Sequence, residues 1–366
     1  MENITDEITF TNYNESKFIL HTNEGKHYIV SKDKKAEIEK ILQSDNAELR
    51  KSVVEKIKTL KSTQKSNLMF FSDFQFKRAI ISAKMMRKLT SIFVLMFNKY
   101  VMSITTIIII MIPSYYFFIN TPDAIAGKIP LGFSWALVFL VFFFHEIGHA
   151  TACTKYNVKA GEIGFGITSY FPVFYANVTE AWRLERSERM IVNFGGIYFQ
   201  NIFSLILMTI GLFTKHFELF FISKAIYIAT IYQFFPFYKS DGYWILSDLI
   251  SEPNLFKSSR NIFYKKLRNP SYKLNRKGYL ILFYYSIISF IITFFIVKMG
   301  IKFYDYIINF PFFIYDSIEK VIKRNFNQIY LDANYLWALF YLVFTIKMII
   351  NNMKTFILSN GADKVK

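Results

Sequence analysis

Two histidines and a glutamate stand at a spacing that suits metal chemistry. The chain reads His145-Glu146-Ile147-Gly148-His149. Residues four apart on a helix lie on one face about one turn apart, so both imidazoles can bind the same metal ion. Glu146 lies one residue further round, where its carboxylate can take a proton from a metal-bound water. Neutral imidazoles bind Zn²⁺ well, and zinc lowers the pKa of its water toward about 7. The pattern therefore predicts zinc-assisted hydrolysis.

A catalytic zinc site of this kind needs a third protein ligand, and the fourth position stays open for water. The best candidate is Asp241, which precedes Gly242. Pro236 and Gly242 would let the backbone leave a helix there and turn the carboxylate inward. The plainer alternatives are a chance match on a helix surface for the histidines and a helix cap at an Asp-Gly turn for Asp241. The histidines end an apolar run, where an ionisable group costs about 2.5 to 3.5 kcal/mol at mid-membrane, and this cost favours the metal site.

These candidates lie near the ends of long apolar segments. Each segment can cross about 30 Å of hydrocarbon as a helix. The segments lie at about 101–119, 131–150, 196–213, 217–237, 279–297 and 335–350. The fold class that we expect is an all-α polytopic membrane protein with about six transmembrane helices.

Two further stretches leave the number of spans open. Residues 91–98 are too short to cross and are expected at the membrane interface. Residues 301–321 are apolar and aromatic, but Asp305, Asp316, Glu319 and Lys320 interrupt them. We expect an interfacial helix or a partial re-entrant segment there, and seven or eight spans remain alternatives.

The basic residues predict an orientation in the membrane. The N-terminal region and the loops at about 151–195 and 238–278 are rich in Lys and Arg, whereas residues 120–130 hold only Lys128. Cytoplasmic loops carry such an excess, so both termini are expected in the cytoplasm. In this topology His149 and Asp241 reach the same depth, near the cytosolic face.

The composition excludes several classes of protein. Of 366 residues, 53% are hydrophobic and 19% aromatic, which excludes a disordered or collagen-like chain. Lys and Arg number 44 against 27 Asp and Glu, so the formal charge is 44 − 27 = +17. The basic residues fall mostly between apolar segments and no nucleic-acid-binding motif accompanies them, so nucleic acid is not an expected partner.

The single cysteine and the chain start add two expectations. Cys153 has no second cysteine to pair with, so no intramolecular disulfide forms. It lies four residues after His149 on the same helical face, where it could be a sulfur ligand or, as usual for a lone buried cysteine, a small apolar side chain. The first residues lack a basic start followed by an apolar core, so no cleavable signal peptide is expected.

These motifs together resemble the site-2 protease family of intramembrane zinc metalloproteases. HEIGHA ends one apolar segment, and Asp241-Gly242 follows about 90 residues later at the end of another. The likeness covers roughly residues 85–260 and is greatest to the branch of peptide zinc metalloproteases associated with making or exporting bacterial peptides. It implies that His145, His149 and Asp241 bind zinc, that Glu146 is the catalytic base, and that the chain lies in a bacterial plasma membrane.

The chain also departs from the pattern of that family. Members commonly have Gly-Pro before an asparagine in the third core helix, and residues 193–201 contain no proline. Gln200 or Asn201 is still a candidate to contact a substrate backbone or the oxyanion. The alternation between Gly161 and Tyr175 predicts a short hairpin at the membrane surface, either a structural re-entrant loop or an edge to which an extended substrate adds.

Three regions are expected along the chain. Residues 1–90 form a cytosolic region of strands and helix, with a winged-helix peptide-recognition module and a solvated extension as the two interpretations. Residues 91–260 form the membrane metalloprotease core, and residues 261–366 form C-terminal transmembrane helices. Arg183, Arg186 and Arg189 are expected to face phospholipid headgroups.

The function that follows is cleavage of a peptide bond in a small peptide or a membrane-associated polypeptide. The family likeness implies maturation or export of a bacteriocin-like peptide, with the lipid bilayer, the substrate and a peptide exporter as partners. One alternative is regulated proteolysis of a single-span signalling protein. Another is a non-enzymatic export or immunity protein, and the intact Glu146 argues against it because a structural zinc site needs no general base.

Overall fold

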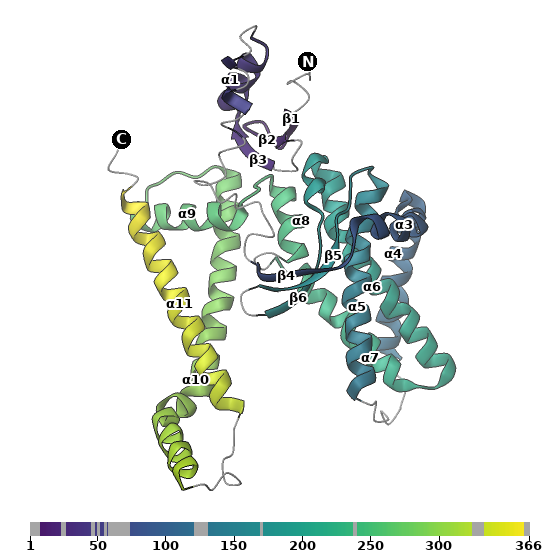
Figure 1. Cartoon of the computed structure of the whole chain (residues 1–366), viewed down its shortest axis with the longest axis vertical. Helices are drawn as coiled ribbons and strands as arrows, with labels where there is room; N and C mark the ends of the chain where they lie inside the picture. The colour runs from purple at the N-terminus through teal and green to yellow at the C-terminus, as the bar shows by residue number, and fades with distance from the viewer. Residues whose placement is uncertain are drawn as a thin grey trace. The chain divides into compact units, whose positions relative to one another are not determined.

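The computed structural model describes residues 8–22, 27–44, 48–49, 52–54, 57, 74–120, 131–168, 171–236, 240–323 and 333–361. These residues are mostly helical, with two small sheets (Figure 1). The chain divides into two compact units, Met1–Asn254 and Leu255–Lys366.

The first described residues form a small sheet followed by a helix. Three strands pair antiparallel in chain order: β1 (Ile8–Asn12), β2 (Lys17–Thr22) and β3 (His27–Ser31). Helix α1 (Lys32–Leu42) begins where the Ser31 hydroxyl accepts a hydrogen bond from the Lys34 N–H, which satisfies one of the unpaired donors of a helix start. Apolar side chains of α1 and the strands form one buried cluster. We call residues 8–44 the N-terminal module; its winged-helix interpretation stays a prediction.

A second antiparallel sheet joins segments that lie far apart in the sequence. Its strands, in spatial order, are β4 (Phe74–Ile81), β5 (Ile163–Thr168) and β6 (Phe171–Ala176). Strands β5 and β6 form the predicted hairpin. Strand β4 and most of helix α3 (Ala83–Phe93) lie within residues 1–90, which we assigned to the cytosolic N-terminal region. Strand β4 nevertheless pairs with β5, and Met86 of α3 is buried among core residues of α5. This stretch packs with the membrane core.

Six helices in the described ranges are long and apolar enough to cross a membrane, and they lie where the six apolar segments predicted them. The first unit holds α4 (Lys99–Ser114) with the π-helical turn η3 (Tyr115–Ile119), α5 (Leu131–Lys155), α6 (Arg186–Thr214) and α7 (Phe217–Phe234). The second unit holds α10 (Arg276–Ile322) and α11 (Ala333–Gly361). Shorter helices are η2 (Val94–Phe97), η4 (Thr179–Arg183), α8 (Asp241–Ile250) and α9 (Leu255–Arg268). How many helices cross the bilayer stays a prediction.

Helix α10 differs from the expected arrangement. We expected residues 301–321 to form a separate interfacial or re-entrant segment, but they continue the helix that begins at Arg276. Pro311 lies inside this helix, which has 47 residues. At 1.5 Å per residue it spans about 70 Å, more than twice the hydrocarbon thickness of a bilayer. The interrupting charges change which side chains meet lipid, but they do not stop backbone hydrogen bonding.

The crossing of α5 and α6 is the contact that positions the predicted site. A Cβ atom added to Gly148 of α5 would lie 2.1 Å from the Gly195 carbonyl oxygen of α6, and one added to Gly195 would lie 2.7 Å from the Gly148 carbonyl oxygen. Only glycine on both helices allows this approach of backbone to backbone. The two helices therefore meet one residue before His149.

Candidate metal centre

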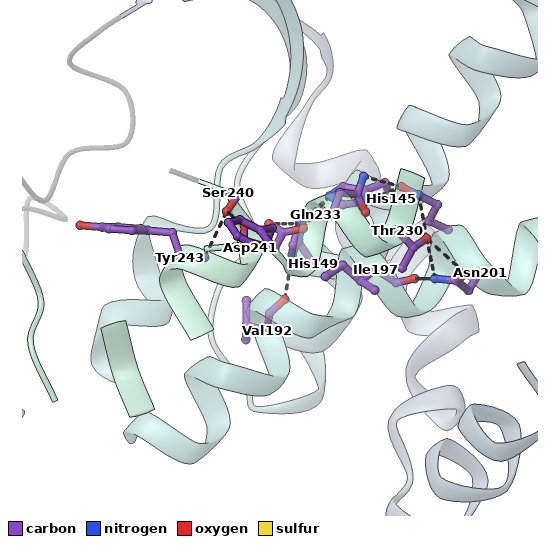
Figure 2. A network of polar contacts seen from close by, with 12 residues as sticks. His145, His149, Val192, Ile197, Asn201, Thr230, Gln233, Ser240, Asp241 and Tyr243 are labelled. Carbon is purple, nitrogen blue, oxygen red and sulfur yellow. Dashed lines mark hydrogen bonds and ion pairs between the residues drawn. The ribbon is translucent and has the colours of Figure 1, made fainter. Parts of the chain in front are cut away.

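One helix and the start of another bring the predicted ligands together. His145 and His149 lie on α5, and Asp241 is the first residue of α8. The Nε2 atoms of the two histidines are 3.1 Å apart. The Asp241 carboxylate places Oδ2 3.2 Å from His145 Nε2 and Oδ1 3.5 Å from His149 Nε2. Among the described residues, this is the group of three His, Cys, Asp or Glu side chains whose ligand atoms could hold one metal ion (Figure 2).

Hydrogen bonds on the far side of each imidazole fix its orientation. His149 Nδ1 lies 2.7 Å from the Val192 carbonyl oxygen, and His145 Nδ1 lies 3.1 Å from Gln200 Oε1. Both partners are acceptors, so each Nδ1 carries the proton and each Nε2 keeps its lone pair. The two lone pairs and the carboxylate then face one another. Such a set of acceptors fits a bound cation.

The spacing of the ligand atoms fits zinc. Zinc binds imidazole nitrogen and carboxylate oxygen at about 2.0 to 2.2 Å in a tetrahedral arrangement, which separates neighbouring ligand atoms by about 3.3 to 3.6 Å. The two imidazole nitrogens are 3.1 Å apart, and the Asp241 carboxylate approaches them to 3.2 Å through Oδ2 and to 3.5 Å through Oδ1. With one carboxylate oxygen as the ligand, all three ligand atoms lie within 4.8 Å of one another. Both histidines are only 8% exposed, so the centre is shielded from bulk water.

Gly196 keeps the space beside the ligand atoms open. A Cβ atom at this position would lie 2.4 Å from His149 Nε2 and 2.6 Å from His145 Nε2. Any side chain on α6 at this point would occupy the place of the ion. The sequence contained this glycine in a double-glycine run, but only the packing of α6 on α5 reveals what it does.

The start of α8 rules out the capping alternative for Asp241. The N-cap of α8 is Ser240, whose hydroxyl accepts a hydrogen bond from the Tyr243 N–H at 3.1 Å and donates one to the Phe235 carbonyl oxygen at 2.9 Å. Asp241 is thus free of the capping role and its carboxylate turns to the histidines. A Cβ at Gly242 would lie 2.1 Å from the Phe234 carbonyl oxygen, so glycine permits the close approach of α8 to the end of α7.

Glu146 lies between the two histidines in sequence and partly shielded from solvent. The Glu146 carboxylate accepts a hydrogen bond from the backbone N–H of Ala176, the last residue of β6. The second sheet therefore borders the metal centre. This contact joins the predicted base to the predicted hairpin.

A network of amides and a hydroxyl lies behind His145. Gln200 Oε1, which accepts from His145, also accepts from Gln233 Nε2 at 2.8 Å, and Gln200 Nε2 donates to Thr230 Oγ1 at 3.2 Å. Asn201 Nδ2 donates to the Thr230 hydroxyl oxygen at 3.1 Å. Gln200 and Asn201 are 1% and 4% exposed, so these candidate substrate contacts are engaged inside the bundle instead. Thr230 and Gln233 were missed, although polar side chains inside an apolar segment were a usable signal.

Cys153 takes the role of a small apolar side chain. It is completely buried in a cluster with Ile147, Ala150 and other apolar residues. Its sulfur is not part of the group formed by the two histidines and Asp241. The sulfur-ligand alternative therefore has no support in the described residues.

Arg189 corrects one expectation about the membrane surface. We expected Arg183, Arg186 and Arg189 to face lipid headgroups, but Arg189 is only 3% exposed and its Nη2 lies 2.6 Å from Asp248 Oδ1. Arg183 Nε pairs with Glu180 at 2.6 Å and is half-buried. The prediction was wrong for Arg189 because its carboxylate partner lies 59 residues further along the chain.

Comparison with known proteins confirms the resemblance inferred from the motifs. The chain matches the model of Peptidase family M50 over residues 132–362, and it belongs to this family, that of the site-2 proteases. The match extends through the last helices, beyond the part that carried the motifs. The cofactor that this membership implies is Zn²⁺.

A particular relative gives a closer comparison. Over 133 residues the chain is 28% identical to the Bacillus subtilis (strain 168) protein named "Putative peptide zinc metalloprotease protein YydH". The aligned residues are 34% of this chain and 53% of the relative, so the chain spans about half the length of the relative that it matches. No solved structure matches this chain.

Proposed function

We propose that the chain is an intramembrane zinc endopeptidase in which His145, His149 and Asp241 hold the metal and Glu146 is the general base. The observation that carries the proposal is the set of three ligand atoms from α5 and α8, with both imidazole Nε2 lone pairs turned toward Asp241. A zinc ion held there supplies Lewis acidity that polarises a peptide carbonyl and lowers the pKa of water toward about 7.

The residues of the chain then have separate tasks in hydrolysis. Glu146 accepts a proton from the attacking water as the water oxygen bonds to the carbonyl carbon. The carbon–nitrogen bond breaks, and Glu146 returns the proton to the leaving amine nitrogen. Gln200 and the Val192 carbonyl oxygen hold the two imidazoles, and Gly196 leaves room beside them. Burial of the histidines limits access of bulk water to the reacting atoms.

The geometry of β6 suggests how a peptide reaches this centre. Strand β6 pairs with β5 along one edge, and no described strand pairs with its other edge. An extended peptide that adds to this edge would have its backbone held by main-chain hydrogen bonds, near the residue whose backbone contacts Glu146. This arrangement supports a substrate that is unfolded at the cleavage point.

The substrate class that we favour is a small peptide or a membrane-associated polypeptide, cleaved near the cytosolic face of a bacterial cell membrane. The word "peptide" in the name of the Bacillus subtilis relative supports this choice. We place both termini in the cytoplasm, with maturation or export of a bacteriocin-like peptide as the biological setting and a peptide exporter as a partner. Peptides released from membranes with and without the protein would separate this setting from cleavage of a single-span signalling protein.

The test of the proposal combines metal analysis with cleavage. Detergent-purified protein should contain about one zinc per chain, and H149A and D241A should lose it, whereas a matched control at the exposed His216 (H216A) should retain it. E146Q should keep zinc but lose cleavage of the substrate. Wild-type protein without zinc, or E146Q with undiminished cleavage, would contradict the proposed mechanism. Resistance or export that survives in E146Q cells would favour the non-enzymatic alternative.

A further inference from the structure

A buried ion pair joins α6 to α8 at the end of α8 away from the metal centre. Arg189 and Asp248 are 3% and 4% exposed. The guanidinium donates from Nε to Asp248 Oδ2 at 3.1 Å and from Nη2 to Oδ1 at 2.6 Å, while Nη1 donates to the Leu184 carbonyl oxygen at 3.0 Å. Two parallel hydrogen bonds fix both the distance and the rotation of the two helices at this point.

The N-terminal module covers this pair with one aromatic ring. Tyr13, in the turn between β1 and β2, is 1% exposed. The Arg189 guanidinium carbon lies 5.0 Å from the centre of the Tyr13 ring and 4.9 Å from that of Trp182. The Tyr13 hydroxyl lies 3.3 Å from both Asp248 Oδ1 and the Ser247 carbonyl oxygen. The ring therefore shields the ion pair from solvent and contacts the backbone of α8 as well.

Two contacts at the rim hold the same turn of the module against the end of α8. Asn14 Nδ2 donates to the Ser251 carbonyl oxygen at 2.9 Å, and Lys17 Nζ lies 2.6 Å from Glu252 Oε1. The side chain of Glu252 is only 8% exposed. The N-terminal module therefore contacts α8 through the buried Tyr13 side chain, with polar contacts from Asn14 and Lys17 around it.

Helical spacing connects the ion pair to the metal centre. Asp241 and Asp248 are seven residues apart on α8, so they lie on the same face two turns apart. On α6, Arg189, Val192 and Gly196 lie at intervals of three and four residues and also share a face. One stripe of α6 therefore contacts Asp248 at one end and the two histidines further along. Helix α8 therefore contacts α6 through Asp248 at one end and the histidines of α5 through Asp241 at the other.

We propose that Tyr13, Arg189 and Asp248 are positioning residues that set the register of α8, so that Asp241 reaches the two histidines. The inference rests on the proposed metal site and adds the N-terminal module to its architecture. A buried ion pair gives little net stability compared with apolar packing, because both charges lose their hydration. Its directional hydrogen bonds fix a register that apolar contacts leave free to slide.

The test uses full-length, zinc-loaded protein and the rate at which zinc passes to a chromophoric chelator. D248N and Y13A should release zinc about tenfold faster than wild type, because Asp241 would no longer be held within reach of both imidazoles. This is the lower end of the 10- to 100-fold loss of affinity that follows when a group that orients a metal ligand directly is removed. Y13F keeps the ring and should stay within about twofold of wild type. The matched control is S204A, which removes a buried hydroxyl that joins α6 to the Ser223 carbonyl oxygen at 2.8 Å.

A second readout needs no metal and separates positioning from general destabilisation. In the zinc-free protein, hydrogen exchange of backbone amides at 241–250 should become faster in Y13A, while amides of α5 keep their protection. Tyr13 lies outside the membrane helices, so Y13A tests the proposal even where D248N does not fold.

Each outcome has one meaning. Wild-type rates of zinc release in both D248N and Y13A would overturn the positioning role while leaving the metal site intact. Equal acceleration in S204A would also overturn it, because any loss of core packing would then suffice. A wild-type protein without zinc would instead reject the proposed function on which this inference rests.

Discussion

The two units of the chain use apolar helices for different purposes. In the most apolar 18-residue stretch of α6, 61% of the residues are buried within the protein, against 6% in α11. Helix α6 contributes glycines and amides to the candidate metal centre, whereas α11 exposes large apolar side chains such as Leu336 and Phe344 along its length. Helices of similar apolar character thus differ in how much of their surface packs against the rest of the protein. Small and polar residues mark the helices that face other helices, and continuous large apolar residues mark those that face lipid.

The sharpest way to break this comparison is a matched pair of glycine substitutions, one in each unit. G196A should abolish zinc binding while the helices stay folded, because the new Cβ would lie 2.4 Å and 2.6 Å from the two ligand nitrogens. G300A on α10 places its Cβ 2.9 Å from the hydroxyl of Tyr341, the far end of a side chain that can shift. G300A should therefore keep one zinc per chain. Zinc analysis of both proteins checks this, and zinc retained in G196A would contradict the assigned site.

A pair of phenylalanine substitutions tests the same comparison through stability. Phe199 on α6 is 3% exposed and stacks on Phe97, with ring centres 5.6 Å apart, whereas Phe294 on α10 is 56% exposed. F199A should lower the free energy of unfolding by about 3 to 5 kcal/mol, because it leaves a cavity. F294A should change it by less than about 1 kcal/mol. Thermal unfolding in detergent measures both, and similar losses would show that α10 is packed against protein rather than lipid.

The amide behind His145 should affect metal affinity rather than folding. Q200L removes the acceptor for His145 Nδ1 and should weaken zinc binding by 10- to 100-fold, which is about 1.4 to 2.7 kcal/mol. Competition with a chelator of known affinity measures this change. L336Q, a polar replacement on the exposed face of α11, serves as the control from the second unit and should leave zinc affinity unchanged. An unaltered affinity in Q200L would mean that His145 is oriented by other contacts.

Two histidines of the N-terminal module make its attachment sensitive to acid. His21 and His27 are buried with their Nδ1 atoms 2.6 Å apart, and Glu180, Arg183 and Arg189 lie around them. Burial, His27 and the two arginines lower the pKa of His21 to about 3, and burial and Arg183 lower the pKa of His27 to about 4. Unfolded histidine titrates near 6.5, so the unfolded chain binds more protons below that pH. Stability is therefore complete above pH 6.5 and falls as the pH drops toward 4.

The expected loss between pH 7.5 and 5.5 is about 1 kcal/mol for each histidine. Limited proteolysis of the module and thermal unfolding, both followed against pH, measure it. H27Q should flatten the pH dependence, whereas H216Q, at an exposed histidine whose side chain is 72% exposed, should leave it as in wild type. Equal pH dependence in H27Q and wild type would remove the histidine pair as its cause.

The residues at the centre of the candidate site could be predicted from local spacing in the sequence. The residues around it depend on long-range packing and could not. His145, Glu146 and His149 are recognisable because helical spacing alone places them together, and Asp241 because an Asp-Gly ends an apolar segment. Gly196 and the Val192 carbonyl oxygen could not be recognised from the sequence, because their roles depend on the packing of α6 against α5. Arg189 resembled a surface arginine for the same reason.

The secondary structure shows the same limit. Strand β4 pairs with β5, whose residues lie more than 80 positions later, and no local pattern encodes that partner. In α10, charged residues interrupted the apolar pattern, and from this interruption we judged residues 301–321 to be a separate segment, although the helix continues through them. Hydrophobic periodicity locates helices well but does not identify the neighbours that determine what they do.

The positions of the proposed ligands along the chain also determine the order in which the ribosome synthesises them. His145 and Asp241 are 241 − 145 = 96 positions apart. At about 5 to 20 residues per second, roughly 5 to 20 s separate their synthesis. The nascent chain therefore carries two of the three proposed ligands, and no complete centre, while α6 and α7 are being made. The interval between synthesis of Tyr13 and of its partner Asp248 is longer still, because 235 positions separate them. Helix α8 carries both Asp241 and Asp248, so its synthesis supplies the third proposed ligand and the partner of Tyr13 within eight residues.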